Sequence, residues 1–216
     1  MSAPESVLDV VPVMPVVVVH DLAAAVPIAQ ALVDGGLPAI ELTLRTPVAL
    51  DALRAIAAEV PDILLGAGTI TTPPQAEAAV EAGARFLVSP GSTPALLAAM
   101  QATGVPFLPG TSTVSEVLAV LEAGQREMKF FPAEASGGVR YLRSVGDPVP
   151  QARFCPTGGI TPASAPDYLA LPNVGCVGGS WITPADAVAA GDWDRIRTLA
   201  AEAAALRSPA SPHPSP

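Results

Sequence analysis

Apolar, β-branched segments alternate with alanine- and leucine-rich segments along nearly the whole chain. The apolar segments predict eight strands, at residues 11–19, 39–44, 63–69, 86–89, 106–110, 128–132, 154–157 and 174–178. The segments between them predict helices at residues 22–34, 48–60, 74–81, 94–102, 114–122, 138–144, 162–169 and 184–189, with a last helix at 193–206. Because parallel strands are joined by crossover connections, usually helices, this alternation indicates a buried parallel sheet.

Eight strand–helix units are the number that a closed (β/α)8 barrel requires, and this chain lies at the short end of the size range of that fold. The main alternative is an open, doubly wound sheet, which carries a glycine-rich turn after its first strand. Here the first predicted strand is followed by His20, Asp21 and Leu22, so that turn is absent. We therefore predict an α/β fold of the TIM-barrel class.

The two ends of the chain differ from the repeating part. Residues 2–10 predict a short helix over the amino-terminal mouth of the barrel. Residues 208–216 read Ser-Pro-Ala-Ser-Pro-His-Pro-Ser-Pro, and proline at this density permits neither helix nor strand. We therefore expect a single barrel domain over residues 1–207 and a disordered, proline-rich tail over residues 208–216.

Charge and composition argue against several classes of partner. The chain has 11 Lys and Arg against 20 Asp and Glu, a formal net charge of −9, whereas nucleic acids and anionic membrane surfaces need a basic face. Its most apolar stretch, residues 10–19, is about half the ~20 residues of a spanning helix. With neither a basic amino terminus nor a disulfide framework, we expect a cytoplasmic protein without nucleic-acid or membrane partners.

Histidine is scarce, since the sequence contains only His20 and His213, and the second lies in the predicted tail. A Ser-His-Asp triad or a histidine-based metal site therefore lacks partners within the predicted barrel. Cys155 and Cys176 lie in separate apolar segments and are expected to be buried packing residues. We predict no metal ion and no cofactor.

The only lysine of the chain, Lys129, lies in the sixth predicted strand between apolar neighbours. A strand in a closed barrel faces the lumen or the surrounding helices, so this side chain is expected to be buried. Burial disfavours the ammonium form, and a neutral amine is the nucleophile that forms an imine with a ketone. We predict Lys129 as a catalytic nucleophile, with a lysine that merely reaches the rim as the alternative.

Glu41, Thr43 and Arg45 fall on one face of the second predicted strand, because side chains alternate along a strand. Polar groups in a packed lumen are costly unless they line a site. A carboxylate near an imine-forming lysine can move protons, and an arginine can hold a substrate carboxylate through two parallel hydrogen bonds. We predict these roles for Glu41 and Arg45, with a structural ion pair between the two as the alternative.

Glycines end the last two predicted strands. A Thr-Gly-Gly sequence at residues 157–159 follows the seventh strand, and a Gly-Gly-Ser sequence at residues 178–180 ends the eighth. The loops after strands seven and eight of such barrels often bind phosphate through backbone N–H groups. The candidate phosphate-binding residues are therefore Gly158, Gly159, Gly179 and Ser180.

Three more candidates lie at the same end of the predicted strands. Thr69 ends the third strand and Pro90 follows the fourth, while Phe131 comes two residues after the lysine. Thr69 is suited to bind a carboxylate, and Pro90 and Phe131 to form an apolar wall beside the substrate. Turn formation and core packing are the alternatives for these residues.

Six short blocks occur in one order along the chain: Glu-Leu-Thr-Leu-Arg-Thr at 41–46, Gly-Ala-Gly-Thr at 66–69, Ser-Pro-Gly at 89–91, Lys-Phe-Phe-Pro-Ala-Glu at 129–134, Cys-Pro-Thr-Gly-Gly-Ile at 155–160 and Gly-Gly-Ser-Trp at 178–181. With these blocks, residues 11–206 resemble the 2-keto-3-deoxy-6-phosphogluconate (KDPG) aldolases. Bifunctional relatives of these enzymes also cleave 4-hydroxy-2-oxoglutarate.

The resemblance implies a class I aldolase that releases pyruvate from KDPG, without metal or cofactor, in the Entner–Doudoroff route. It implies a Schiff base on Lys129, acid–base catalysis by Glu41, and pyruvate contacts from Arg45 and Thr69. Pro90 and Phe131 would line the pocket, and the phosphate would lie at the two glycine-rich loops. The partners would be a phosphorylated keto acid and pyruvate, and the assembly a homotrimer.

Two functions without an imine stay open from the residues alone. A phosphate-binding barrel isomerase or decarboxylase would use Lys129 as an acid. A catalytically silent phosphosugar-binding barrel would keep the glycine-rich loops and would not need a buried amine.

Overall fold

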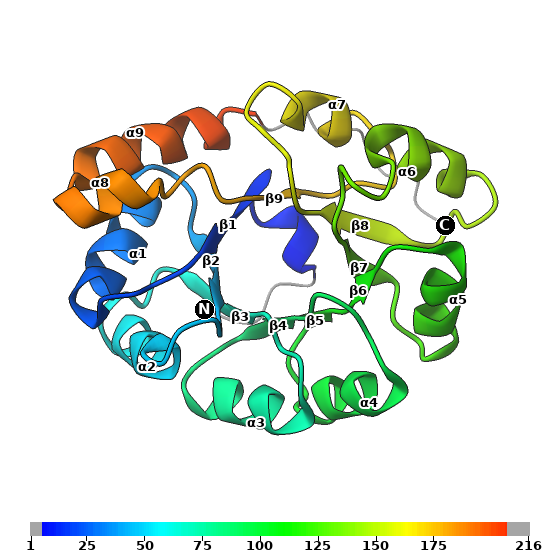
Figure 1. Ribbon diagram of the computed structural model, residues 1–216, viewed down its shortest axis with the longest axis horizontal. Helices are drawn as coiled ribbons and strands as arrows, with labels where there is room; N and C mark the ends of the chain where they lie inside the picture. Colours follow the sequence, from blue (N-terminus) through cyan, green and yellow to red (C-terminus); the bar gives the residue numbers. More distant parts are fainter. Residues whose placement is uncertain (1–5, 207–216) are drawn as a thin grey trace.

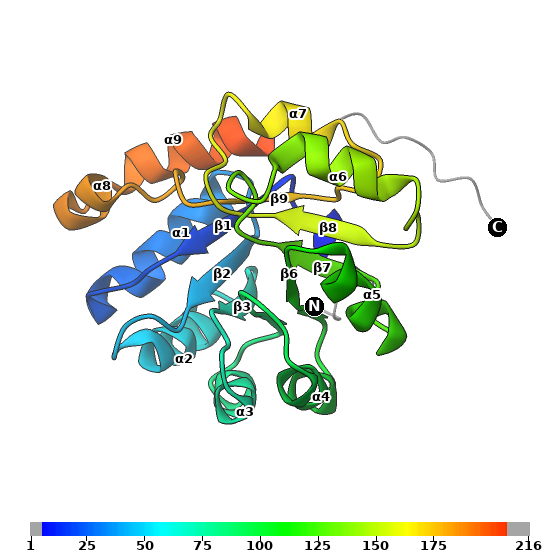
Figure 2. The ribbon, with the colours of Figure 1, turned by 45° about the vertical axis from the view of Figure 1, so that its right-hand side comes forward.

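In the computed structural model, which describes residues 6–206, parallel strands lie at the centre and helices surround them (Figure 1). The strands are β1 (Val13–Val17), β2 (Ala39–Thr43), β3 (Leu64–Gly68), β4 (Phe86–Val88), β5 (Phe107–Leu108), β6 (Gly110–Thr111), β7 (Glu127–Phe130), β8 (Arg153–Pro156) and β9 (Val177–Gly179). The helices are α1 (Ala25–Asp34), α2 (Ala49–Glu59), α3 (Pro73–Glu81), α4 (Pro94–Ala102), α5 (Val114–Glu122), α6 (Gly138–Gly146), α7 (Ala165–Leu169), α8 (Ala185–Ala190) and α9 (Trp193–Ala204). Figure 2 shows the helices on the outer side of the curled strands.

The named strands pair only in parallel within the described residues. One sheet has the order β5-β4-β3-β2-β1-β9, and a second has the order β6-β7-β8. Isolated parallel bridges join Phe154 to Val174 and Thr157 to Gly178, which connects β8 and its following residue with the segment around β9. The architecture is therefore an α/β barrel-like fold, as the alternating sequence pattern predicts.

The fifth predicted strand is present as two short pieces, β5 and β6, on either side of Pro109. β5 pairs with β4, whereas β6 pairs with β7. Proline has no N–H to donate to a ladder, so the strand is interrupted at this residue, but the Pro109 carbonyl still accepts the Lys129 N–H at 3.0 Å. β7 therefore stays hydrogen-bonded to the segment formed by Pro109 and β6, despite the interruption.

Helix boundaries follow local capping interactions. Thr93 and Thr113 accept hydrogen bonds from N–H groups in the first turns of α4 and α5, and prolines occupy the first turns of α3 and α4. The predicted helix 22–34 begins as a 3-10 turn, η2 (Leu22–Ala24), and continues as α1. α7 is shorter than the predicted 162–169, because Thr161 and Ser164 form a hydrogen-bonded turn before it.

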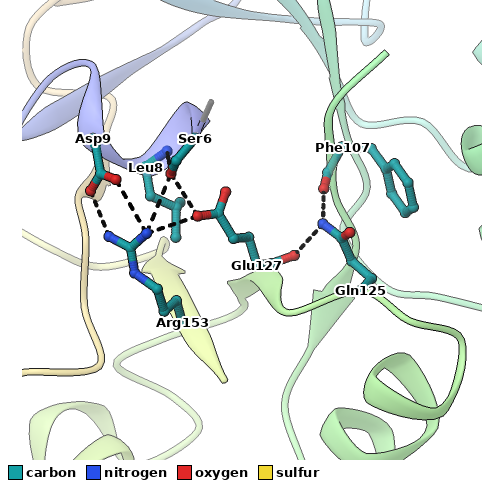
Figure 3. A network of polar contacts seen from close by, with 7 residues as sticks. All are labelled: Ser6, Leu8, Asp9, Phe107, Gln125, Glu127 and Arg153. Carbon is teal, nitrogen blue, oxygen red and sulfur yellow. Dashed lines mark hydrogen bonds and ion pairs between the residues drawn. The ribbon is translucent and has the colours of Figure 1, made fainter. Parts of the chain in front are cut away.

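The amino-terminal segment covers the end of the barrel at which β7 and β8 begin. A short 3-10 turn, η1 (Val7–Asp9), lies within the predicted helix 2–10 (Figure 1), of which residues 2–5 lie outside the described part of the chain. Leu8 within this turn is fully buried. Arg153, the first residue of β8, donates to Asp9 at 2.5 Å and to Glu127 at 2.9 Å, while Ser6 donates to Glu127 at 2.6 Å (Figure 3). These bonds join η1 to the first residues of two strands.

Burial raises the pKa of the Glu127 carboxyl above its ordinary value, although the bonds from Ser6 and Arg153 act in the opposite direction. Both donors therefore favour the charged carboxylate against the effect of burial.

The predicted tail, residues 208–216, lies outside the described residues. Over residues 6–206, none of the helices combines the length and the apolar character needed to cross a membrane.

Replacing Arg153 with methionine should lower the free energy of unfolding by about 1–3 kcal/mol, because Glu127 loses its cationic partner in a partly buried site. Thermal or urea unfolding followed by circular dichroism measures the change. Arg54→Met is the matched control, since Arg54 pairs with Asp51 on α2 and both side chains are more than half exposed, at 57% and 62%. Equal losses of stability in the two variants would contradict a structural role for the Arg153 network.

Candidate active site

Lys129 and Glu41 meet inside the barrel. Lys129 is the third residue of β7 and Glu41 the third residue of β2, and their side chains point into the same lumen. The Lys129 Nζ donates to the Glu41 Oε1 at 3.1 Å, and the two side chains are only 6% and 2% exposed. Two residues 88 positions apart in the sequence therefore form a buried ion pair, and both were singled out from the sequence.

Glycine on the neighbouring strand makes room for this carboxylate. Glu41 pairs with Gly66 and lies beside Gly68 of β3. A Cβ on Gly68 would lie 2.2 Å from the Glu41 Oε1, which is far inside van der Waals contact. A Cβ on Gly66 would collide in the same way with the ring of Phe86. The glycines of the Gly-Ala-Gly-Thr block thus leave space for side chains in the lumen.

An aromatic ring and hydroxyl groups surround the lysine strand. The Lys129 Nζ lies 5.4 Å from the centroid of the Phe131 ring. Thr111 Oγ1 donates to the Lys129 carbonyl oxygen at 3.3 Å, and the Gly110 N–H donates to Ser89 Oγ at 3.2 Å. Three further hydroxyl residues are buried at or just after the carboxyl end of a strand, and the sequence pattern did not predict them as site residues: Ser89, Thr111 and Thr157.

Arg45 lies at the rim and is exposed. β2 ends at Thr43, and the Arg45 N–H donates to the Thr43 carbonyl at 2.8 Å, so the chain turns before it reaches Arg45. The alternation that predicts a shared face therefore applies to Glu41 and Thr43 and does not extend to Arg45. Thr46 Oγ1, which donates to the Val19 carbonyl at 2.6 Å, fixes the loop that carries Arg45 beside the end of β1.

Thr69 follows β3 directly and has a backbone φ of +60°. This left-handed conformation is a strained one for a β-branched residue. Hydrogen bonds on both sides hold it, from the Leu44 N–H to the Gly68 carbonyl at 2.8 Å and from the Ile70 N–H to the Val88 carbonyl at 3.1 Å. A strained residue held between two loops at a strand end is typical of a functional position.

Pro90 lies half-buried against the β6 strand. A Cβ on Gly110 would lie 2.2 Å from the Pro90 carbonyl carbon, so the backbones at these two residues are in close contact. Gly110 is in turn the pairing partner of Lys129. Pro90 is therefore one strand away from the lysine, and its role in lining the site stays a prediction.

The two glycine-rich loops lie side by side. Thr157 forms a parallel bridge with Gly178, and a Cβ on Gly178 would lie 2.2 Å from Thr157 Oγ1. Gly158 and Gly159 have φ values of +105° and +81°, which favour glycine at both positions of this double-glycine turn (residues 157–159). The other two candidate phosphate ligands belong to the second glycine-rich loop. Gly179 is the last residue of β9, and Ser180, the next residue, is exposed.

Metal-ligating side chains do not cluster in the part of the chain that the structure describes, where no three His, Cys, Asp or Glu residues are placed to hold a metal ion. Cys155 and Cys176 are buried free thiols. The hydrogen bond between them, together with burial, raises the pKa of Cys176 above its ordinary value, so this thiol stays protonated. The burial of both free thiols agrees with their interpretation from the sequence as packing residues.

Comparison with known proteins identifies the family. The model of the aldolase family described as "KDPG and KHG aldolase" matches residues 5–199. The KHG/KDPG aldolase of Escherichia coli K12 is 54% identical over 202 residues, which cover 94% of this chain and 95% of that protein.

Two solved structures that are similar to this chain are also KDPG aldolases. A KDPG aldolase from Legionella pneumophila, with pyruvate captured as a covalent carbinolamine intermediate, is 46% identical, with a TM-score of 0.90 over 91% of this chain and 96% of its own. The KDPG aldolase of Zymomonas mobilis ZM4, with 3-phosphoglycerate, is 47% identical, with a TM-score of 0.89 over 94% and 95% of the two chains. The chain belongs to the KDPG and KHG aldolase family and is therefore an aldolase, a carbon–carbon lyase.

Proposed function

We propose that this protein is a class I aldolase that cleaves KDPG to pyruvate and glyceraldehyde 3-phosphate, and that also cleaves 4-hydroxy-2-oxoglutarate to pyruvate and glyoxylate. The observation that carries the proposal is the 3.1 Å contact between the Lys129 amine and the Glu41 carboxylate in the lumen. The similar enzymes support it, since one holds pyruvate as a covalent carbinolamine and another has both substrates in its name.

The first half of the reaction forms the imine. Transfer of one proton across the 3.1 Å contact between the Lys129 Nζ and the Glu41 Oε1 gives a neutral amine and a carboxylic acid. The amine attacks the C2 ketone of the substrate and gives a carbinolamine. Glu41 then returns its proton to the C2 hydroxyl, which leaves as water, and a protonated imine forms on Lys129.

The second half breaks the carbon–carbon bond. Glu41, again a carboxylate, takes the proton of the C4 hydroxyl, and the electrons of the C3–C4 bond pass to the protonated imine, which becomes an enamine. The aldehyde leaves, C3 of the enamine is protonated, and water hydrolyses the imine to pyruvate and free Lys129. Because the protonated imine accepts the electrons, the reaction needs neither a metal ion nor a cofactor.

The remaining site residues bind the substrate in this proposal. Arg45 and Thr69 hold the carboxylate of pyruvate, and Phe131 and Pro90 form the wall beside the imine. Backbone N–H groups of the two glycine-rich loops and the Ser180 hydroxyl bind the phosphate, a use of backbone donors common in barrels of this class.

For the protein as a whole, we propose a complete eight-stranded TIM barrel in one domain, with β5 and β6 as the two halves of its fifth strand. The isolated bridges beside β9, which connect the two sheets, support closure of the barrel. We further propose a homotrimer in the cytoplasm that serves the Entner–Doudoroff route.

Borohydride reduction in the presence of pyruvate should trap one covalent adduct on Lys129, because the amine forms an imine that the reagent reduces. Peptide mass spectrometry locates the adduct, and the assignment is simple because the chain has no other lysine. Lys129→Arg should lose both trapping and activity, since guanidinium stays protonated. An adduct confined to the amino terminus would instead favour an isomerase, a decarboxylase or a silent binding barrel.

Glu41→Gln should reduce kcat by ~10²- to 10⁴-fold with a small change in KM, because the amide keeps the shape of the side chain but cannot move protons. Steady-state kinetics of pyruvate release measure the effect. Gly68→Ala tests the position of Glu41 in a second way. The added methyl group would occupy the space of the Glu41 carboxylate and should also lower kcat. Near-normal kcat in Glu41→Gln would identify Glu41 as only a structural partner of Lys129.

Arg45→Ala should mainly raise KM, by about 10- to 100-fold for every 2-keto acid, because the substrate carboxylate loses a charged hydrogen-bond donor. The same kinetics, together with weaker borohydride trapping of pyruvate, test this. Arg54→Ala, which removes an exposed arginine from α2, is the matched control and should leave KM unchanged. A KM effect confined to the phosphorylated substrate would instead assign Arg45 to the phosphate.

A further inference from the structure

Beyond the residues already assigned, Tyr168 and Glu134 form a contact behind the double-glycine turn. Tyr168, on α7, is fully buried, and its hydroxyl donates to Glu134 Oε1 at 2.6 Å. Burial, the hydrogen bond and the charge of Glu134 all raise the pKa of Tyr168 well above its ordinary value, so the hydroxyl stays a donor at any working pH. The buried hydroxyl therefore has the Glu134 carboxylate as its hydrogen-bond acceptor.

Glu134 lies directly against the double-glycine turn. Its N–H donates to the Gly158 carbonyl at 3.1 Å, and the preceding Ala133 N–H donates to the Thr157 carbonyl at 2.8 Å. A Cβ on Gly159 would lie 2.8 Å from Glu134 Cγ, so the stem of the glutamate packs on the backbone of that residue. Glu134 thus holds the turn through its backbone and through its side chain.

The same segment leads back to the imine-forming lysine. Glu134 follows Lys129 by five residues, at the end of the Lys-Phe-Phe-Pro-Ala-Glu block. Between them, the Phe131 ring lies 5.4 Å from the Lys129 Nζ on one side and 3.3 Å from the position of a Cβ on Gly158 on the other. A displacement of Glu134 would therefore change the position of the turn relative to the lysine.

A glycine provides the space for the tyrosine. Gly138, the first residue of α6, has a φ of +56°, and a Cβ there would lie 2.9 Å from the Tyr168 hydroxyl. α6 and α7 lie side by side in both views (Figure 1, Figure 2). The hydroxyl therefore occupies a fitted position between the two helices, with the Glu134 carboxylate as its acceptor.

We propose that Glu134 and Tyr168 are positioning residues that fix the double-glycine turn at the distance from Lys129 that a phosphorylated keto acid requires. This inference rests on the proposed function, because it takes the turn as part of the phosphate site. In 4-hydroxy-2-oxoglutarate the distal carboxylate is bonded directly to C4 and lies nearer the imine than the phosphate on C6 of KDPG, so we expect this shorter substrate not to reach the turn. The pair therefore determines the preference between KDPG and 4-hydroxy-2-oxoglutarate and leaves the chemistry at Lys129 unaffected.

Tyr168→Phe removes only the hydroxyl and should raise KM for KDPG about tenfold while kcat stays near that of the unmodified protein. Kinetic constants for 4-hydroxy-2-oxoglutarate should not change. Tyr141→Phe is the matched control, because Tyr141 is a tyrosine of the adjacent α6 whose hydroxyl is buried with no hydrogen-bond partner among the described residues. This control should leave the constants for both substrates unchanged.

Glutamate variants give an independent comparison. Glu134→Ala removes the acceptor and the packing on Gly159, so it should also raise KM for KDPG selectively, whereas Glu134→Gln keeps an acceptor for Tyr168 and should lie closer to the unmodified protein. Equal losses on both substrates, or no difference between Tyr168→Phe and Tyr141→Phe, would overturn the positioning role. Absence of aldol cleavage in the unmodified protein would instead overturn the proposed function, and this inference with it.

Discussion

A lysine and a glutamate share the water-poor lumen of the barrel, and much of the surrounding structure follows from the need to keep them there. Isolated, either charge would be strongly destabilising at 6% or 2% exposure. Together, at 3.1 Å, they compensate each other, but a buried ion pair contributes little net stability. The pair is therefore better explained by chemistry than by stability, since an amine and a carboxylate in direct contact can exchange a proton.

The parallel strands hold this pair with little freedom. Lys129 and Glu41 each lie within a strand with paired neighbours on both sides, so neither depends on a loop for its position. The residues proposed to bind the substrate, in contrast, lie just beyond the strand ends, where Thr69 and the glycines at residues 158 and 159 adopt positive φ values. Rigid strands thus carry the reacting groups, and loops of unusual backbone geometry carry the binding groups.

The sequence predicts the fold and the central pair well, because both depend on strong, local signals. Alternating apolar segments indicate the strands, and a lysine within such a segment stands out. The sequence pattern put Arg45 on the same strand face as Glu41 and Thr43. Alternation of side chains holds only within a strand, however, and β2 ends at Thr43, two residues before Arg45. No pattern in the sequence predicts the contact between Tyr168 and Glu134, because the two residues lie 34 positions apart and meet only through tertiary packing.

The stabilising contacts of Arg153 and the residues proposed to bind substrate lie at opposite ends of the strands. At the amino end, the Arg153 network joins η1 to Glu127 and Arg153, the first residues of β7 and β8. At the carboxyl end, glycines leave space for side chains, Thr69 is strained, and Tyr168 donates to Glu134, the proposed positioning residue of the double-glycine turn. Because β7 begins at Glu127 and carries Lys129, only one residue, Met128, separates the Arg153 network from the proposed nucleophile. The strand that carries the proposed nucleophile is therefore anchored at its first residue by the ion pair between Glu127 and Arg153.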